Sequence, residues 1–223
     1  MRAVIFDLDG TLADTSGDLI ASANACFEGL GMEVRLDPKA DQLTAFGGGK
    51  AMLRLGFSRS DRPWTEEDIA AQYPVLLRAY AEAIDHHTTL YPGAVDAVEA
   101  LRRAGFATAI CTNKPEALAQ TLCRNLGIRD LFGALIGADT LPQRKPDPAP
   151  YHACLAAIGG DLGRSMLIGD TVTDRDTARA VGVPIVLVGF GPEGQGVTRL
   201  EPDALLHHYE DLPEMALRML GPA

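Results

Sequence analysis

The chain has 223 residues, 47% of them hydrophobic, which is enough for the core of one large domain or of one domain with a smaller insert, and which excludes global disorder. Its formal net charge of −10 disfavours nucleic-acid binding, because a phosphate backbone needs clustered lysines and arginines. A small anionic ligand is not excluded, since a bound cation and a few well-placed basic groups decide the local field.

The four cysteines show neither a CxxC motif nor the spacing of a zinc site, so we expect reduced and buried thiols. The N-terminus lacks the basic segment and long apolar run of a signal peptide. No apolar stretch has the length of a membrane span. These features predict a cytoplasmic protein with neither nucleic acid nor membrane as a partner.

The first predicted element, a strand over residues 2–8, ends abruptly in charge. Val4-Ile5-Phe6 is typical of a buried strand, and Asp7 and Asp9 follow at once, before a Gly-Thr pair. Two carboxylates this close repel each other unless a cation joins them, and Mg²⁺ is a hard ion that prefers such ligands. Because ligands bind at strand ends in α/β sheets, the pair predicts a metal-assisted carboxylate site.

Helical spacing dominates the next part of the chain. Apolar residues recur at helical intervals over 14–31 and 65–84, and the second segment begins with a threonine cap and three acidic residues. Between them, Gly47-Gly48-Gly49 predicts a loop that leads into a short helix within 43–57. Residues 14–88 are therefore expected to be almost entirely helical.

From Tyr91 onward, helices and strands alternate. The predicted helices end mostly at glycines, and the short apolar strands stop at polar or glycine-containing turns. The helices are expected at 94–104, 115–126, 149–158 and 174–181, the strands at 107–111, 134–137, 166–168 and 184–188, and a last strand and helix within 203–220. Such alternation indicates a parallel sheet with helices on both faces.

The predicted architecture is thus an α/β fold with a Rossmann-like parallel sheet in a core domain of residues 1–13 and 89–223. A small helical cap domain of residues 14–88 is inserted after the first strand. An insert that leaves from the C-terminal end of a strand is expected to lie over the ligand crevice and to act as a lid.

Polar clusters follow the predicted strands, and strand ends of such a sheet can converge on one crevice. The clusters are Asp7 with Asp9, Thr112 with Asn113, Lys145, and Asp170 with Asp174. Carboxylates hold Mg²⁺, whereas lysine, hydroxyl and amide donors suit the oxygens of a phosphoryl group. A carboxylate can also attack phosphorus and become an aspartyl phosphate. The residue types themselves therefore indicate phosphoryl transfer.

In these motifs the chain resembles the haloacid dehalogenase superfamily. The matching segments, in the order of the family, are Asp7-Leu8-Asp9-Gly10-Thr11, Thr112-Asn113, Lys145-Pro146 and 169–174. The resemblance covers nearly the whole chain, and the insert corresponds to the family's small helical cap. It implies a Mg²⁺-dependent phosphatase for a small phosphorylated metabolite, and the choice between a monomer and a homodimer stays open.

The resemblance also implies roles for the acidic residues. Asp7 would be the nucleophile and a Mg²⁺ ligand. Asp9 would protonate the leaving oxygen, then activate water, and its backbone carbonyl would also bind Mg²⁺. Asp170 would be a further metal ligand, and Asp174 another acidic partner of the metal, directly or through water.

The remaining roles concern the substrate. By the same resemblance, Thr112 and Asn113 would bind phosphate oxygens, and Lys145 would neutralise the phosphate and the nucleophile. The segment 111–115 resembles the phosphoglycolate phosphatases most, and their cap also carries a Gly-rich loop. We infer that Gly49 and Lys50 meet the non-phosphate end of the substrate, where a small carboxylate would suit the lysine. The expected activity is hydrolysis of 2-phosphoglycolate.

Other interpretations apply to single residues and to the whole protein. Asp174 is also suited to cap the following helix, and Lys50 to be an ordinary solvated lysine. The pairs His86-His87 and His207-His208 lack the spacing of a helical metal site. Rival functions are hydrolysis of pyrophosphate, a sugar phosphate or a nucleotide, and a non-catalytic phosphate-binding regulatory module.

Overall fold

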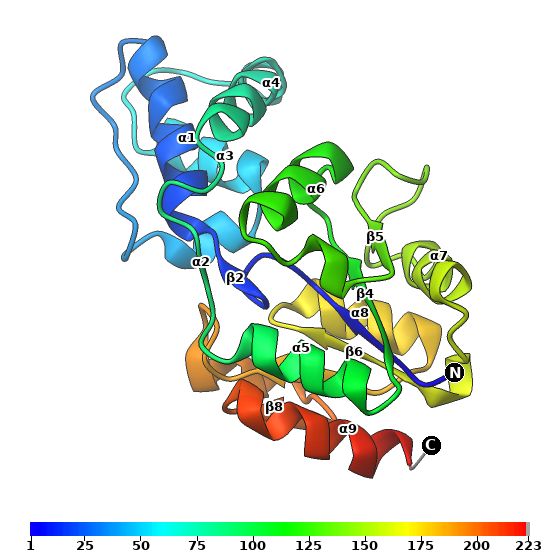
Figure 1. The fold of residues 1–223 in the computed structure, drawn as a ribbon. Coiled ribbons are helices and arrows are strands. Elements are labelled where there is room, and N and C mark those ends of the chain that lie inside the picture. Colours follow the sequence, from blue (N-terminus) through cyan, green and yellow to red (C-terminus); the bar gives the residue numbers. More distant parts are fainter. Residues whose placement is uncertain (222–223) are drawn as a thin grey trace. The chain divides into compact units, whose positions relative to one another are not determined.

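The computed structural model describes residues 1–221, which form two compact units. The first, here called the sheet unit, contains Met1–Asp14 and the chain from Leu90 onward, and the second, the helical unit, contains Thr15–Thr89 (Figure 1). Within the described residues, no helix combines the length and the apolar character that crossing a membrane requires.

The sheet unit is built on six parallel strands in the order β5-β4-β1-β6-β7-β8. Their bounds are β1 (Ala3–Phe6), β4 (Ala107–Cys111), β5 (Ala134–Ile136), β6 (Ser165–Gly169), β7 (Ile185–Val188) and β8 (Ala204–Leu206). Strand β1 pairs with β4 on one side and β6 on the other. This topology confirms the predicted α/β fold with a Rossmann-like parallel sheet.

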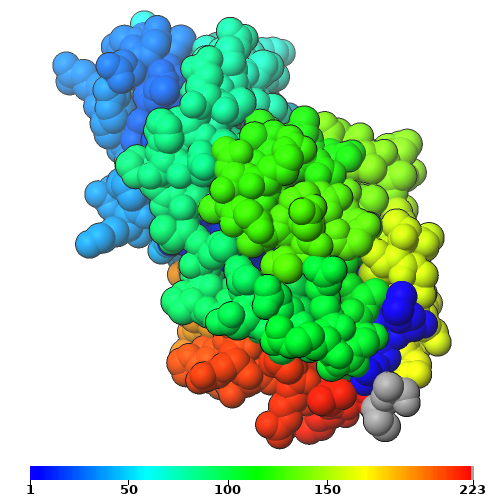
Figure 2. Space-filling view, in the orientation of Figure 1, coloured from blue at the N-terminus to red at the C-terminus, as the bar shows by residue number. Residues whose placement is uncertain are grey.

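Helices cover the sheet of this unit. They are α5 (Ala94–Arg103), α6 (Glu116–Asn125), α7 (Ala149–Ile158), α8 (Val172–Val181) and α9 (Leu212–Leu220). Side chains from β1, β4, β6, α7 and α8 share one hydrophobic core, in which Ile5, Tyr151 and Leu167 are fully buried. Helices α5 and α9 pack side by side, and in the view of Figure 2 they and α6 hide the strands. The residues of β1, β6 and β7 are buried throughout.

Short 3₁₀ helices complete the sheet unit, and their bounds are η1 (Arg129–Leu131), η2 (Leu162–Arg164), η3 (Gly194–Leu200) and η4 (Tyr209–Asp211). Two elements differ from the sequence-based expectation at the strand ends. Strand β1 stops at Phe6 because the chain turns at once, and α8 begins at Val172 because Thr171 and Asp174 form a capping box there.

The turn after β1 is tight. The N–H groups of Leu12 and Ala13 both donate to the carbonyl of Leu8, at 2.9 and 3.1 Å, and Gly10 has a φ of +80°, in the left-handed region that favours glycine. The short strands β2 (Ala13–Asp14) and β3 (Thr89–Leu90) then form a two-stranded sheet where the chain leaves the sheet unit and returns to it. The carboxylates of this turn are therefore carried by a well-anchored backbone.

The helical unit has its own core. It contains α1 (Ser16–Gly29), α2 (Gln42–Phe46), α3 (Gly49–Ser58) and α4 (Glu66–Glu82). Their apolar faces bury residues such as Phe27 and Ile69, and a salt bridge of 2.6 Å joins the buried Asp41 to Arg59. Helix α2 occupies part of the stretch that the glycine run predicts as a loop, so only Gly47 and Gly48 separate α2 from α3.

Candidate active site

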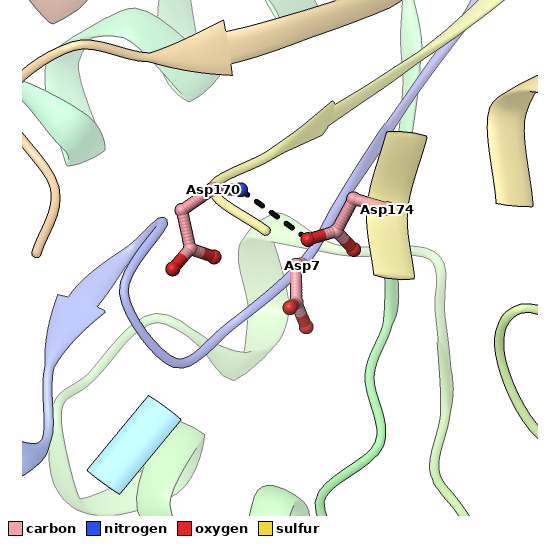
Figure 3. Close-up of side chains that lie close together, drawn as sticks. All are labelled: Asp7, Asp170 and Asp174. Carbon is pink, nitrogen blue, oxygen red and sulfur yellow. Dashed lines mark hydrogen bonds between the residues drawn. The ribbon is translucent and has the colours of Figure 1, made fainter. Parts of the chain in front are cut away.

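Three aspartates come together at the carboxyl edge of the sheet (Figure 3). Asp7 follows β1, Asp170 follows β6, and Asp174 lies in the first turn of α8. One carboxylate oxygen of each lies within 4.8 Å of the others, and the three residues are 9%, 4% and 0% exposed. The N–H of Asp7 donates to the carbonyl of Ile168 at 2.9 Å, so the parallel pairing of β1 with β6 brings these strand ends together.

Both carboxylate oxygens of Asp174 are engaged. One oxygen accepts from the Thr171 hydroxyl at 2.8 Å and from the Asp170 N–H at 3.3 Å, the contact drawn in Figure 3. The other accepts from the Nζ of Lys145 at 2.7 Å. Asp174 thus caps α8 and at the same time contacts the backbone of Asp170 and the ammonium of Lys145.

Asp170 is also linked to the turn after β1. The Thr11 hydroxyl donates to Oδ1 of Asp170 at 3.0 Å. The chain after β7 approaches both segments closely, because a Cβ on Gly191 would lie 2.9 Å from the carbonyl oxygen of Gly10 and 3.5 Å from the Cβ of Asp170. A glycine at position 191 is therefore required for this approach.

Lys145 brings positive charge into the cluster. Its Nζ lies 2.7 Å from Asp174 and 3.1 Å from Asp7, and its side chain is 1% exposed. The side-chain amide of Asn113 donates to the backbone carbonyl of Lys145 at 2.9 Å. Asn113 therefore holds the loop that carries the lysine.

Burial and mutual repulsion control the protonation of these groups. Burial raises the pKa of Asp7 to about 6, against the opposing effect of Lys145. Burial, followed by the charges of Asp174 and Asp7, holds the pKa of Asp170 well above its ordinary value. Burial by itself would lower the pKa of Lys145, but the Asp174 and Asp7 carboxylates outweigh it and raise that pKa. Lys145 is therefore charged. Its single positive charge does not offset the burial and the mutual repulsion of the three carboxylates.

The donor set fits a hard divalent cation. Carboxylate oxygens are the ligands that Mg²⁺ prefers, and three buried ones converge here. In the wider set, four carboxylates stand against two ammonium groups: Asp7, Asp9, Asp170 and Asp174 against Lys114 and Lys145. One divalent cation would balance this set, and buried charges are tolerated where they are paired or bound to a metal.

Thr112 lies at the same edge, at the end of β4. Its N–H donates to the carbonyl of Ile136 at 2.9 Å, and its hydroxyl accepts from the N–H of Lys114 at 3.2 Å. The residue is 3% exposed. Strand β4 pairs with β1, so Thr112 and Asp7 follow two neighbouring strands.

Lys114 is a residue of this edge for which the sequence analysis predicted no role. Its Nζ lies 2.7 and 2.9 Å from the two carboxylate oxygens of Asp9, and the side chains are 3% and 19% exposed. The only signal in the sequence was its place directly after Thr112 and Asn113. Each aspartate of the first turn is thus held by its own lysine.

The two candidate residues of the insert lie in the helical unit. Gly49 is the first residue of α3, and Gly48 before it has a φ of +91°. Lys50 is exposed, with its ammonium 5.4 Å from the centroid of the Tyr73 ring. A role of Gly49 and Lys50 toward a substrate stays a prediction.

Known proteins resemble this chain over nearly its full length. Residues 1–182 match the family model of the haloacid dehalogenase-like hydrolases. The chain is 34% identical to the phosphoglycolate phosphatase of Mesorhizobium japonicum, across 99% of this chain and 97% of that protein. It is 35% identical to the phosphoglycolate phosphatase of Caulobacter vibrioides, across 97% and 91%.

Solved structures share the fold. A predicted phosphoglycolate phosphatase from Haemophilus somnus superposes with a TM-score of 0.82 at 23% identity, covering 96% of this chain and 97% of that one. CbbY from Rhodobacter sphaeroides, solved in complex with phosphate, gives a TM-score of 0.75 at 23% identity, covering 95% and 96%. The family model, the relatives and the fold agree, and the chain belongs to the haloacid dehalogenase-like hydrolases.

Proposed function

We propose that the protein is a Mg²⁺-dependent phosphomonoesterase that hydrolyses 2-phosphoglycolate through an aspartyl phosphate. The observation that carries this proposal is the separate pairing of the first two aspartates, Asp7 with Lys145 at 3.1 Å and Asp9 with Lys114 at 2.7 Å. Two carboxylates kept in different surroundings can serve as nucleophile and as acid/base. A module that only binds phosphate needs neither.

In the first half-reaction, a carboxylate oxygen of Asp7 attacks phosphorus and the ester P–O bond breaks. Asp9 gives a proton to the departing oxygen, so glycolate leaves with its hydroxyl restored. Lys145 neutralises charge on the nucleophile and the phosphoryl group, and Thr112 and Asn113 bind phosphoryl oxygens. Asp7 then carries the phosphoryl group.

In the second half-reaction, Asp9 is a carboxylate and takes a proton from water. This water attacks phosphorus, the P–O bond to Asp7 breaks, inorganic phosphate leaves, and both aspartates return to their starting states. Asp7, Asp170 and the backbone carbonyl of Asp9 would hold Mg²⁺, with Asp174 as a further acidic partner. When bound, the ion supplies the positive charge that lets an anionic nucleophile meet an anionic substrate.

The choice of substrate is supported by relatives of 34% and 35% identity over nearly the whole chain. We infer that the helical unit acts as the cap, because the insert begins directly after the turn that carries the first two aspartates. Lys50 would then face the carboxylate of the substrate. The proposal includes a cytoplasmic protein, monomeric or homodimeric, without nucleic acid or membrane as a partner.

The test is hydrolysis of p-nitrophenyl phosphate by the full chain, with Mg²⁺ and with EDTA, at several pH values. We expect turnover that requires Mg²⁺. Complete absence of turnover with Mg²⁺ would refute the proposed enzymatic activity. A panel of 2-phosphoglycolate, a sugar phosphate, a nucleotide and pyrophosphate then ranks the substrates by kcat/KM. A higher kcat/KM for another substrate would make that compound the preferred substrate in place of 2-phosphoglycolate and would still agree with a phosphatase. Binding of these compounds without turnover would identify a regulatory module.

A further inference from the structure

Lys114 is a buried lysine whose ammonium contacts both carboxylate oxygens of Asp9, at 2.7 and 2.9 Å. A buried ammonium is costly unless it is paired, and an apolar residue of similar size would avoid that cost. The reaction described above gives Asp9 two proton transfers and gives Lys114 no task. The pairing of a buried cation with the acid/base residue therefore calls for a functional explanation.

The backbone of Lys114 is held from both sides. Its N–H donates to the hydroxyl of Thr112 at 3.2 Å, and its carbonyl accepts from the N–H of Ala138 at 2.9 Å. Pro115 follows, with a φ of −51°, and fixes the entry to α6. The lysine therefore projects from a rigid turn at the end of β4 and can define the direction of a more exposed partner.

We propose that Lys114 is a positioning residue for Asp9: its ammonium orients the Asp9 carboxyl group and stabilises the carboxylate that forms when the proton leaves. This role rests on the proposed function. In the first half-reaction the proton moves from Asp9 to the ester oxygen as the P–O bond breaks, and the negative charge appears beside Lys114. In the second half-reaction the same carboxylate takes a proton from water, a step that is common to all esters and that does not enter kcat/KM.

The role of Lys114 can be tested with esters whose leaving groups differ in basicity. Nitrophenolate departs with little protonation, whereas the alkoxides of ethanol and glycolate need a proton, and a well-placed acid contributes roughly 10²–10⁴-fold to such a step. We expect Lys114→Met to lower kcat/KM, which reports the steps up to phosphorylation of Asp7, about 10- to 100-fold for ethyl phosphate and 2-phosphoglycolate. For p-nitrophenyl phosphate the loss should stay below about threefold, because that ester depends little on the acid.

The three substrates separate this role from its rivals. A rise in KM for 2-phosphoglycolate alone, with ethyl phosphate unaffected, would make Lys114 a ligand of the substrate carboxylate and overturn the proposal. An equal loss of kcat/KM for all three esters would show a structural role and overturn it as well. Failure of the wild type to hydrolyse any of them would instead refute the proposed function.

Two further variants complete the test. Lys114→Arg keeps the charge and should recover much of kcat/KM for the alkyl esters, while Lys39→Met, at an exposed position of the helical unit, should match wild type. In an Asp9→Asn background, Lys114→Met should cost no further activity, because a residue that acts through Asp9 has lost its target. Additive losses would contradict the proposal. Should Lys114→Met unfold, as shown by circular dichroism, Lys114→Arg decides, because a loss of kcat/KM shared equally by all three esters would contradict the proposal.

Discussion

The hydroxyl of Tyr209 donates a hydrogen bond of 2.7 Å to the backbone carbonyl of Thr11, across 198 positions of the chain. Thr11 in turn donates through its side chain to Asp170 at 3.0 Å. The Tyr209 ring packs against Phe190, with 5.1 Å between the ring centroids. A residue near the C-terminus therefore holds the turn that carries the first two aspartates through the backbone of that turn.

Tyr209→Phe keeps the ring and removes the donor. The Thr11 carbonyl then loses this partner, and an unsatisfied buried group costs about 1–3 kcal/mol, measurable by urea unfolding. We also expect kcat to fall several-fold, because the turn loses its anchor. Tyr151→Phe is the matched control, since its hydroxyl bonds to Ser165 at 2.9 Å within the same unit. Equal kcat values for the two variants would show that the Tyr209 contact serves stability alone.

Asp7→Asn should abolish turnover while the fold survives. Asparagine has the same size but cannot form the acyl phosphate, and Lys145 keeps Asp174 as its partner at 2.7 Å. Labelling with a ³²P-phosphate ester and acid quenching should trap a phosphoprotein in wild type and none in the variant. Substantial residual hydrolysis by a folded Asp7→Asn protein would rule out this residue as the nucleophile.

Mg²⁺ should raise the melting temperature of the wild-type protein, because a ligand that binds only the folded state stabilises it. Asp170→Asn should remove most of that increase, since Asp170 belongs to the buried three-carboxylate cluster. Asp176→Asn, on the partly exposed side of α8, is the control and should respond to Mg²⁺ as wild type does. A full response in Asp170→Asn would place the ion elsewhere.

Lys50→Ala should raise KM for 2-phosphoglycolate more than for p-nitrophenyl phosphate, because only the former carries a carboxylate. The comparison is made on the same protein preparation, with Lys39→Ala as an exposed lysine control from the same unit. If both substrates lose affinity equally in Lys50→Ala, Lys50 has no part in specificity.

The strands and helices of the sheet unit could be predicted because their local patterns agree with their final environment. The strand expected at 107–111 forms at those residues, since its apolar run is buried on both faces of the sheet. The segment 43–57 was harder: Gly47-Gly48-Gly49 indicates a loop, yet α2 and α3 leave only two residues between them. Propensity for a turn there was outweighed by the packing of Ala45 and Met52 in the core of the unit.

The candidate site also contains features that the sequence predicts and features that it does not. Strand-end positions of Asp7 and Asp170 are encoded in apolar runs that stop at a carboxylate, so their neighbourhood could be anticipated from the sequence alone. The burial of Lys114 could not be anticipated, because a lysine in a sequence can be exposed or buried and nothing in the local pattern distinguishes the two. The sequence did suggest the cap that one oxygen of Asp174 forms, but not the contact of its other oxygen with Lys145, 29 positions away.

The hydrogen-bond register that sets the carboxylate spacing joins β1 directly to β4 and β6, and none of it passes through residues 15–89. The inserted helices can therefore be exchanged, lengthened or redesigned without a change in the pairing of these strands. On the proposed function, the sheet unit carries the reaction and the insert selects the substrate. Engineering a new substrate preference should thus begin in the insert, with the sheet left untouched.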